Sequence, residues 1–300
     1  MTYIDTFKEA KDLLTPGTSA CKGCGGEMLL RRVLKIAGEN SVIVVPPGCM
    51  AGAGSVGWDT LSGMKIPVHM TLLDNTASFL TGVSEIYQRR GRGDVNIIGF
   101  AGDGATADCG FQSLSGAAER GDKMLYICYD NEGYMNTGYQ RSSTSSLGSR
   151  TSTTPVGKVI KGKSQHQKYL PLIMMMHNVE YVATASPSNM MDFTKKVEKG
   201  LAASKRGFAY IHLCSPCPTG WGYASNKSIE FAKNSVKSNF FPLLEYEDGK
   251  LTLKDNKNPM PVSEFVKGIT KFRHLDDEKI EQLQNMVDHR MNVLRKLADA

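Results

Sequence analysis

The chain has 300 residues, of which 41% are hydrophobic and 22% are charged, and its formal net charge is +6. These values predict a compact globular protein, and because the positive charges are spread along the sequence they argue against nucleic-acid binding. The longest apolar run, 170–176, is far shorter than the ~20 residues that cross a bilayer. Residues 1–14 lack the pattern of a signal peptide. We therefore expect a cytoplasmic protein that binds neither nucleic acid nor a membrane.

Apolar segments alternate with segments of helical periodicity over most of the chain. The apolar segments cover residues 41–45, 67–73, 95–102, 124–130, 179–185 and 208–214. The helical segments between them cover residues 26–37, 76–89, 108–120, 167–177 and 188–204. This alternation is typical of a parallel sheet that is buried on both faces, so we predict a three-layer α/β fold with a mostly parallel sheet. Ligands of such folds bind beyond the carboxyl ends of the strands.

Two segments between these elements have the composition of loops. Residues 48–57 are rich in glycine and residues 142–155 in serine and threonine, and we expect both to be flexible or to become ordered only against a ligand or partner. After residue 239 the pattern changes to a hairpin around 247–250 and a final helix. We therefore divide the chain into a main domain, 1–239, and a C-terminal arm, 240–300, which packs on it or on another subunit.

A glycine-rich turn follows the third predicted strand. Gly102 and Gly104 let the backbone approach a phosphate, and Asp103 between them offers a carboxylate to a cation. Asn131 follows the next strand, 28 residues after Asp103. Its side-chain oxygen, the carbonyl of Gly133 and two diphosphate oxygens would nearly complete the octahedral shell that Mg²⁺ requires. This spacing resembles the thiamine diphosphate motif, and the competing interpretation is a tight turn without a ligand.

The seven cysteines are an odd number, which argues against a complete disulfide framework and favours metal ligation in a reducing compartment. Cys21 and Cys24 have the spacing of a shared metal site or of a redox disulfide. With Cys214 and Cys217 they could form a zinc site, and with single cysteines from two other loops they could hold a [4Fe–4S] cluster. The zinc site leaves Cys49 unexplained, although this residue lies in the glycine-rich segment at a strand end.

Five segments together resemble a known family. They are residues 21–38, 46–52, 102–121, 129–143 and 217–221. Together they resemble the thiamine diphosphate-binding β subunit of the 2-oxoacid:ferredoxin oxidoreductases, in particular the pyruvate:ferredoxin oxidoreductase group. The resemblance extends over roughly residues 15 to 240, and it implies a thiamine diphosphate-binding fold.

For the cysteines, the resemblance implies a [4Fe–4S] cluster close to the cofactor. Its four thiolate ligands would be Cys21, Cys24, Cys49 and Cys217. Cys214, close to Cys217, is the alternative fourth ligand. Cys109 and Cys128 lie within a predicted helix and a predicted strand, and we interpret them as core residues.

For the cofactor, the resemblance implies thiamine diphosphate bound through Mg²⁺, with Asp103, Asn131 and Gly133 as the protein's metal ligands. The predicted cofactor-binding residues are Gly48, Cys49, Asp74, Asn75, Gly102, Asp103, Gly104, Ala105, Asn131, Tyr134, Asn136 and Thr137. Asn136 is expected to face the reacting centre and contact the substrate or an intermediate. Two places depart from the family pattern: Glu27 is displaced by one position, and residues 72–78 differ from the usual form, so Asp74 and Asn75 are the least specific members of the set.

The activity implied by the resemblance is oxidative decarboxylation of a 2-oxoacid, most often pyruvate, with coenzyme A as acyl acceptor and ferredoxin as electron acceptor. The glutamate that activates thiamine would come from another subunit with the pyrimidine-side domain, and a further subunit would carry a ferredoxin-like two-cluster module. Relatives that act on oxalate, aryl-glyoxylates or branched-chain 2-oxoacids are alternatives. A second alternative function is that of a non-redox thiamine-dependent decarboxylase or carboligase with structural zinc. A third is that of a non-catalytic scaffold subunit.

Overall fold

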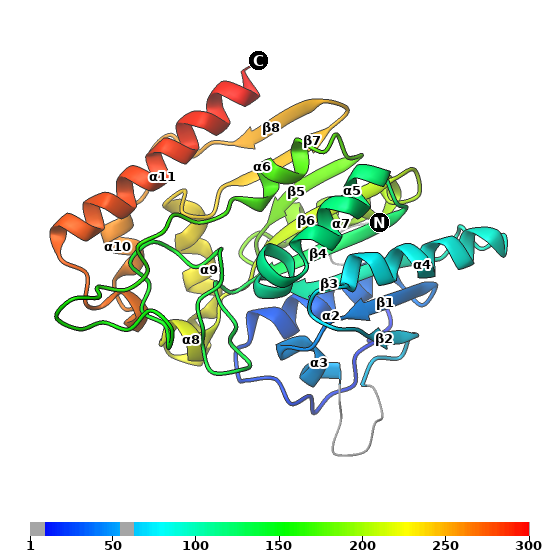
Figure 1. The fold of residues 1–300 in the computed structure, drawn as a ribbon, viewed down its shortest axis with the longest axis horizontal. Helices are drawn as coiled ribbons and strands as arrows, with labels where there is room; N and C mark the ends of the chain where they lie inside the picture. The colour runs from blue at the N-terminus through cyan, green and yellow to red at the C-terminus, as the bar shows by residue number, and fades with distance from the viewer. Residues whose placement is uncertain (1–9, 55–62, 300) are drawn as a thin grey trace.

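The structure is a computed structural model that describes residues 10–54 and 63–299. Its centre is an eight-stranded sheet with the order β2–β1–β3–β4–β6–β5–β7–β8 (Figure 1). The strands are β1 (Ser41–Val45), β2 (Val68–Met70), β3 (Asn96–Gly102), β4 (Met124–Asp130), β5 (Tyr181–Ala185), β6 (Phe208–Cys214), β7 (Leu243–Glu247) and β8 (Lys250–Lys254). The first six pair in parallel, whereas β7 and β8 are antiparallel.

Helices cover both faces of this sheet. They are α2 (Gly25–Ala37), α3 (Cys49–Gly54), α4 (Thr76–Arg89), α5 (Phe111–Arg120), α6 (Leu170–Met175), α7 (Met190–Ala203), α8 (Pro218–Trp221), α9 (Ser228–Lys237), α10 (Val262–Val266) and α11 (Asp277–Ala298). Three short helical segments complete the set: a π-helix, η1 (Gly104–Cys109), and two 3₁₀ turns, η2 (Ser225–Lys227) and η3 (Thr270–Phe272). Among the described residues, no helix combines the length and apolarity needed to cross a membrane.

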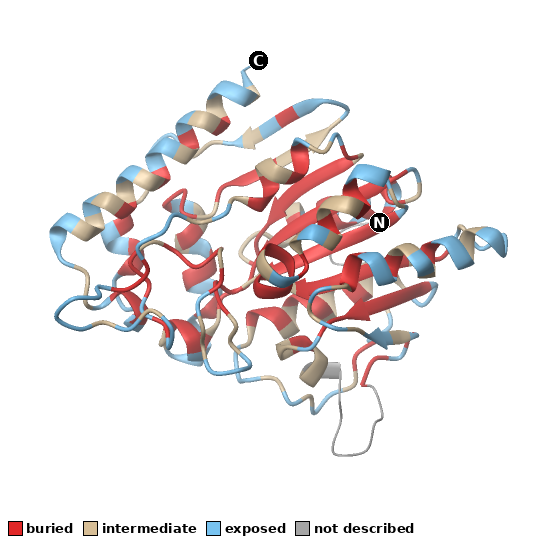
Figure 2. Ribbon diagram, viewed as in Figure 1, coloured by how far each residue is buried: buried red, intermediate tan, exposed pale blue. Residues whose placement is uncertain are grey.

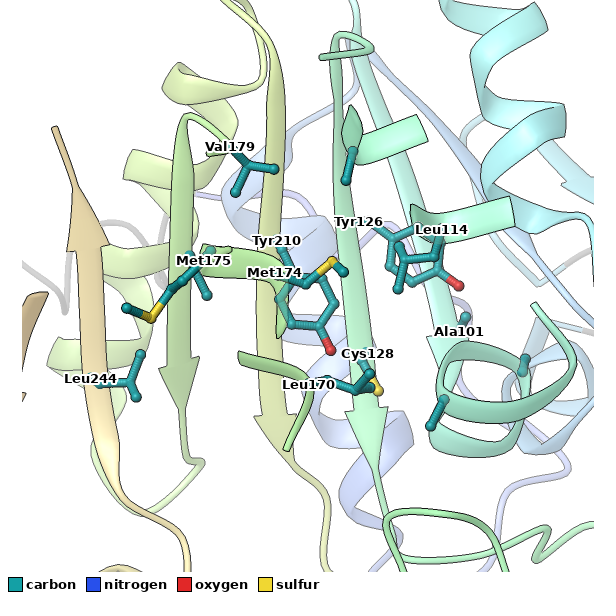
Figure 3. Close-up of a cluster of buried hydrophobic side chains, with 14 of the residues drawn as sticks. Ala101, Leu114, Tyr126, Cys128, Leu170, Met174, Met175, Val179, Tyr210 and Leu244 are labelled. Atoms are coloured by element: carbon teal, nitrogen blue, oxygen red, sulfur yellow. The ribbon is translucent and has the colours of Figure 1, made fainter. Parts of the chain in front are cut away.

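The core lies in two layers, one on each face of the sheet. Because side chains alternate along a strand, Tyr126 and Cys128 of β4 face the layer formed with α4, α5, α6 and α11, whereas Leu125 and Ile127 face the layer formed with α2 and α7. Figure 3 shows the first of these layers, in which Leu170 and Met174 of α6 contribute to the same cluster as β4. The central strands are buried along their length (Figure 2). The predicted three-layer α/β fold is therefore confirmed.

The predicted elements are all present, with differences at their ends. The strand expected at 67–73 is shorter, Val68–Met70, because it lies at the sheet edge and pairs on one side with β1. The helix expected at 108–120 is divided: a π-helix runs from Gly104 to Cys109, and α5 follows it. Cys109, at the end of the π-helix, is exposed, so its interpretation as a core residue is wrong, whereas Cys128 is buried as expected. In the π turn the amide of Gly110 donates to the carbonyl of Ala105 at 2.8 Å.

Residues 240–298 continue the fold of the preceding chain. The β7–β8 hairpin extends the sheet by pairing β7 with β5. The inner face of α11 places Leu283, Val287 and Met291 in the same apolar layer as the strands. The division at residue 239 stays a prediction, but the C-terminal segment shares its core with the rest of the chain.

The two segments with loop composition have different outcomes: 142–155 contains no helix or strand, as expected of a loop, whereas 48–57 is partly helical. The glycine-rich segment begins with a short helix, α3, and its residues 55–57 lie outside the described residues. The serine-rich segment is ordered and buried against the carboxyl ends of β3 and β4, with Ser142, Thr144, Ser145 and Ser146 all at most 1% exposed. Its hydroxyl groups satisfy carboxylates there, which composition alone does not reveal.

Candidate active site

A pocket opens at the carboxyl ends of β1, β3 and β4. Ten of the twelve predicted cofactor-binding residues line it, namely Gly48, Cys49, Gly102, Asp103, Gly104, Ala105, Asn131, Tyr134, Asn136 and Thr137. Gly133, the third predicted metal ligand, lines it as well, together with Pro47, Leu73, Tyr129 and Met135. Parallel strands end at the same edge of the sheet, so residues distant in sequence meet there.

The structure does not bring Asp74 and Asn75 to this pocket. Asn75 precedes α4, and its side-chain oxygen accepts from the amide of Leu72 at 3.1 Å. Leu73 lines the pocket in their place. Glu27, the residue displaced from the family pattern, lies on α2 and forms an ion pair with Arg31 at 2.9 Å.

The glycines of the turn are required by close approach of the backbone to aromatic rings. A methyl group at Gly104 would lie 2.5 Å from the ring of Tyr134, whose hydroxyl donates to the Gly104 carbonyl at 3.0 Å. A methyl group at Gly102 would lie 3.2 Å from the Tyr129 hydroxyl. A side chain at either position would therefore fill the cradle in which a phosphate could meet the backbone.

Asp103 is fully buried, and its two oxygens have different surroundings. Oδ2 accepts from the hydroxyls of Ser142 and Thr144, the latter at 2.8 Å. Oδ1 faces Asn131, whose backbone amide donates to it at 3.4 Å. Burial raises the pKa of Asp103 well above its usual range, and the charge of nearby Asp130 adds to the rise. This carboxylate has no ion-pair partner among the described residues, so a cation beside it would favour ionisation.

The side-chain amide of Asn131 completes a cluster of polar atoms. One of its terminal atoms lies 3.0 Å from Asp103 Oδ1 and 2.9 Å from the carbonyl oxygen of Gly133. If this atom is the nitrogen, it donates to both. If it is the oxygen, three oxygens converge and require a cation between them. Adjacent ligands of octahedral Mg²⁺, each about 2.1 Å from the metal, are about 3 Å apart, so the spacing fits such an ion.

Four cysteines line a second cavity, of about 260 Å³, next to the first. They are Cys21, Cys24, Cys49 and Cys217. Burial raises the pKa of Cys49 to about 12, and the thiolates of Cys24, Cys217 and Cys21 add to this rise, so the four sulfurs lie close enough to repel one another when charged. Cys214 does not line the cavity: it is buried, with Sγ 3.5 Å from the Ser235 hydroxyl.

Three of these cysteines stand where helices begin. Cys24 precedes α2, Cys49 is the first residue of α3, and Cys217 caps α8, accepting from the Gly220 amide at 3.2 Å. Burial raises the pKa of Cys24 and Cys217, and the free N–H groups at the helix starts oppose this rise in part. Within the described residues, no three His, Cys, Asp or Glu side chains are placed to hold a single metal ion.

The two cavities share a wall. Cys49, Asn131, Met135 and Asn136 line both of them. Asn136 is exposed at this wall, so its amide can reach a molecule in either cavity. Sequence reasoning missed Ser142 and Thr144, which hold Asp103, because a serine-rich composition is equally typical of a solvated loop.

The sequence pattern of the family described as "Thiamine pyrophosphate enzyme, C-terminal TPP binding domain" matches residues 67–213. This match runs from β2 to the last but one residue of β6 and includes every strand end of the pocket except that of β1. The fold and the pocket thus define the class of the protein as a thiamine diphosphate-binding domain.

Similar proteins of known name assign the chain to a family within this class. The chain is 47% identical to the NADH-dependent phenylglyoxylate dehydrogenase subunit beta of Aromatoleum evansii, over 96% of this chain and 65% of that one. It is 43% identical to the pyruvate synthase subunit PorB of Methanothermobacter marburgensis, over 95% and 98%. The 2-oxoglutarate:ferredoxin oxidoreductase of Magnetococcus marinus shares the fold, with a TM-score of 0.57 and 21% identity over 75% and 79%. The chain therefore belongs to the thiamine diphosphate-binding β subunits of the 2-oxoacid:ferredoxin oxidoreductases.

Proposed function

We propose that this chain is the catalytic β subunit of a 2-oxoacid:ferredoxin oxidoreductase that binds thiamine diphosphate through Mg²⁺ and holds one [4Fe–4S] cluster. The observation that carries the proposal is the wall shared by the two cavities. This wall supports the proposal because the pocket that would hold the diphosphate and metal adjoins the cavity lined by the four cysteines. A decarboxylating cofactor and a one-electron acceptor need this proximity, since electrons must pass from one to the other.

The magnesium ligands would be Asp103, Asn131 and the carbonyl of Gly133. Support comes from the polar atoms that converge at 2.9 and 3.0 Å and from the buried carboxylate that lacks a counter-charge in the described chain. The hydroxyls of Ser142 and Thr144 hold Oδ2 of Asp103 and so direct Oδ1 toward the metal position.

The cluster ligands would be Cys21, Cys24, Cys49 and Cys217. The thiols surround one cavity, and no three of the described acidic, cysteine or histidine side chains are placed to hold one ion. A cluster suits this arrangement better than zinc, because each thiolate of a cluster binds a different iron, whereas zinc requires all four sulfurs about 2.3 Å from one point. Cys214 faces away from the cavity, which weighs against a zinc site built from the two pairs.

The chemistry that bound thiamine diphosphate supplies is stabilisation of a carbanion at the carbon that loses CO₂. This chain's part is to bind the diphosphate, to orient the reacting end toward Asn136, and to keep the thiols within reach. Asp103 is the sole carboxylate among the described residues that line the two cavities. In the proposed complex, a partner subunit supplies the glutamate that activates thiamine, and electrons leave through a further subunit with a ferredoxin-like module to ferredoxin.

The substrate we propose is pyruvate, with coenzyme A as acyl acceptor, since several relatives that match this chain over most of their length are named pyruvate synthase subunits. An aryl-glyoxylate is the second candidate, because the relative named phenylglyoxylate dehydrogenase is 47% identical, although this chain spans 65% of it. A cytoplasmic location stays a prediction.

The test uses the complex purified with its partner subunits. Reduction of ferredoxin is measured with pyruvate, phenylglyoxylate, 2-ketoisovalerate and oxalate, with and without coenzyme A, alongside iron, zinc and thiamine diphosphate content. We expect about four irons per β subunit beyond those of the partners and turnover of pyruvate or phenylglyoxylate. A colourless complex that contains zinc and decarboxylates without reducing ferredoxin would contradict the proposal, and a complex that binds no thiamine diphosphate would make the chain a scaffold.

A further inference from the structure

The turn from Asn131 to Gly133 carries two of the three proposed metal ligands, and its middle residue has an unusual backbone. Glu132 has φ of 65°, in the left-handed region that glycine adopts freely and other residues rarely do. A non-glycine residue keeps such a conformation where its surroundings hold it there. Asn131 and Gly133 can therefore point toward Asp103 together only while Glu132 is held.

The carboxylate of Glu132 is held by a buried ion pair. Its partner is Lys271, which lies on η3, 139 residues further along the chain. The side chains of Glu132 and Lys271 are 7% and 2% exposed. The hydroxyl of Ser146 also donates to this carboxylate, at 2.6 Å.

The same lysine touches a second support of the turn. Its ammonium lies 4.3 Å from the ring centre of Trp221, within range of a cation–π contact. The indole N–H of Trp221 donates to the carbonyl of Asn131 at 2.8 Å. Trp221 ends α8, the helix that Cys217 caps. One buried cation from the C-terminal segment is thus linked to the turn twice, directly at Glu132 and through Trp221 at Asn131.

Glu132, Lys271 and Trp221 do not line the cofactor pocket. Trp221 and Lys271 line a separate cavity that also contains Arg150. None of the three side chains can therefore contact a molecule in the cofactor pocket directly, and the turn from Asn131 to Gly133 links them to it.

We propose that the Glu132–Lys271 ion pair is a positioning device for the magnesium ligands, so that the C-terminal segment controls the affinity of the site for thiamine diphosphate and Mg²⁺. This inference rests on the proposed function. Without Lys271, the buried carboxylate of Glu132 loses its counter-charge and moves toward water. The turn then relaxes from its left-handed conformation, and the oxygens of Asn131 and Gly133 no longer converge with Asp103.

The test measures binding rather than turnover. Thiamine diphosphate is titrated into the cofactor-free complex at fixed Mg²⁺ by calorimetry, for the wild type and for Lys271→Met, and thermal unfolding is followed in parallel. We expect the dissociation constant to rise at least tenfold in Lys271→Met. The matched control is Lys196→Met, which removes another buried lysine, one paired with Asp192 at 3.0 Å on α7. It should lower thermal stability and leave the dissociation constant within twofold of the wild type.

A second background separates positioning from stability. Glycine adopts the left-handed backbone conformation of residue 132 without strain, so the turn can keep its conformation in Glu132→Gly although the ion pair is absent. In that background, adding Lys271→Met should change the dissociation constant less than threefold, because the lysine no longer has a carboxylate to hold. An equal loss in both backgrounds, or wild-type affinity in Lys271→Met, would overturn the inference. If Lys271→Met does not assemble, Glu132→Gln is titrated in its place, because it removes the ion pair and keeps the size of the side chain. Its dissociation constant for thiamine diphosphate should rise as well, and wild-type affinity would overturn the inference. Absence of binding to the wild type would overturn the proposed function itself.

Discussion

Thr144 offers the sharpest test of how the serine-rich segment serves the metal site. Its hydroxyl lies 2.8 Å from Asp103 Oδ2 and 2.9 Å from Asp130 Oδ1; Thr144 and Asp103 are buried, and the side chain of Asp130 is 10% exposed. Thr144→Val replaces the hydroxyl by a methyl group of similar size, so packing is kept while the hydrogen bonds are lost. We expect Asp103 to lose its fixed orientation and thiamine diphosphate to bind more weakly.

The expected loss of affinity follows from the number of hydrogen bonds that the Thr144 hydroxyl can donate. A hydroxyl has one proton, so Thr144 donates to one carboxylate at a time, and the substitution removes one hydrogen bond to a charged group. Such a bond contributes about 1.5–3 kcal/mol. If this free energy is lost from the metal-bound state, the affinity for thiamine diphosphate decreases roughly ten- to a hundredfold, since about 1.4 kcal/mol corresponds to a factor of ten. Ser142 still donates to Asp103 Oδ2, so the site should be weakened rather than abolished.

The assay is calorimetric titration of thiamine diphosphate into the cofactor-free complex at several Mg²⁺ concentrations. Thr144→Ser, which retains the hydroxyl, should bind within about threefold of the wild type, a difference of ~0.7 kcal/mol. Thr194→Val is the remote control, since Thr194 is buried on α7 and its hydroxyl donates to the Met190 carbonyl at 2.8 Å. Wild-type affinity in Thr144→Val, or equal weakening in Thr194→Val, would refute the reasoning.

Three further predictions concern the metal, the cluster and pH. Asp103→Ala should weaken thiamine diphosphate binding by more than tenfold, over ~1.4 kcal/mol, and leave the cluster in place, measured by titration and iron content; unchanged affinity would mean that the glycine-rich turn binds no metal. Cys49→Ala should remove cluster iron and ferredoxin reduction, whereas Cys128→Ala, in the core of β4, should keep both; full iron content in the first variant would exclude Cys49 as a ligand. Burial lowers the pKa of Lys163 to about 8. Above this pH the unfolded chain binds more protons at this residue than the folded one, so stability against urea should rise from pH 8 toward ~10.5 relative to Lys163→Met, and parallel curves for the two proteins would contradict it.

The sequence alone determined the sheet and pointed to the strand ends where the proposed ligands meet. Apolar runs such as 95–102 and 124–130 are too uniform for an amphipathic strand, and a strand buried on both faces is the arrangement that removes them from water. The glycines around Asp103 and the interval to Asn131 follow from one strand–helix–strand unit, so both residues had to arrive at neighbouring strand ends. The thiol pair Cys21 and Cys24 lies within one turn, and a local pattern of this kind can be found without knowledge of the fold.

The tertiary structure decided which residues hold these groups in place. Composition could not distinguish a solvated serine-rich loop from one that is buried against carboxylates, because Ser142 and Thr144 have the same propensity in either setting. Neither could it choose between Cys214 and Cys217, which are three residues apart but face a helix and a cavity respectively. Lys271 is still less visible in sequence: it contacts Glu132 across 139 residues, and a contact of that range is created by packing of the C-terminal segment against α8 and the turn after β4 rather than by any local pattern.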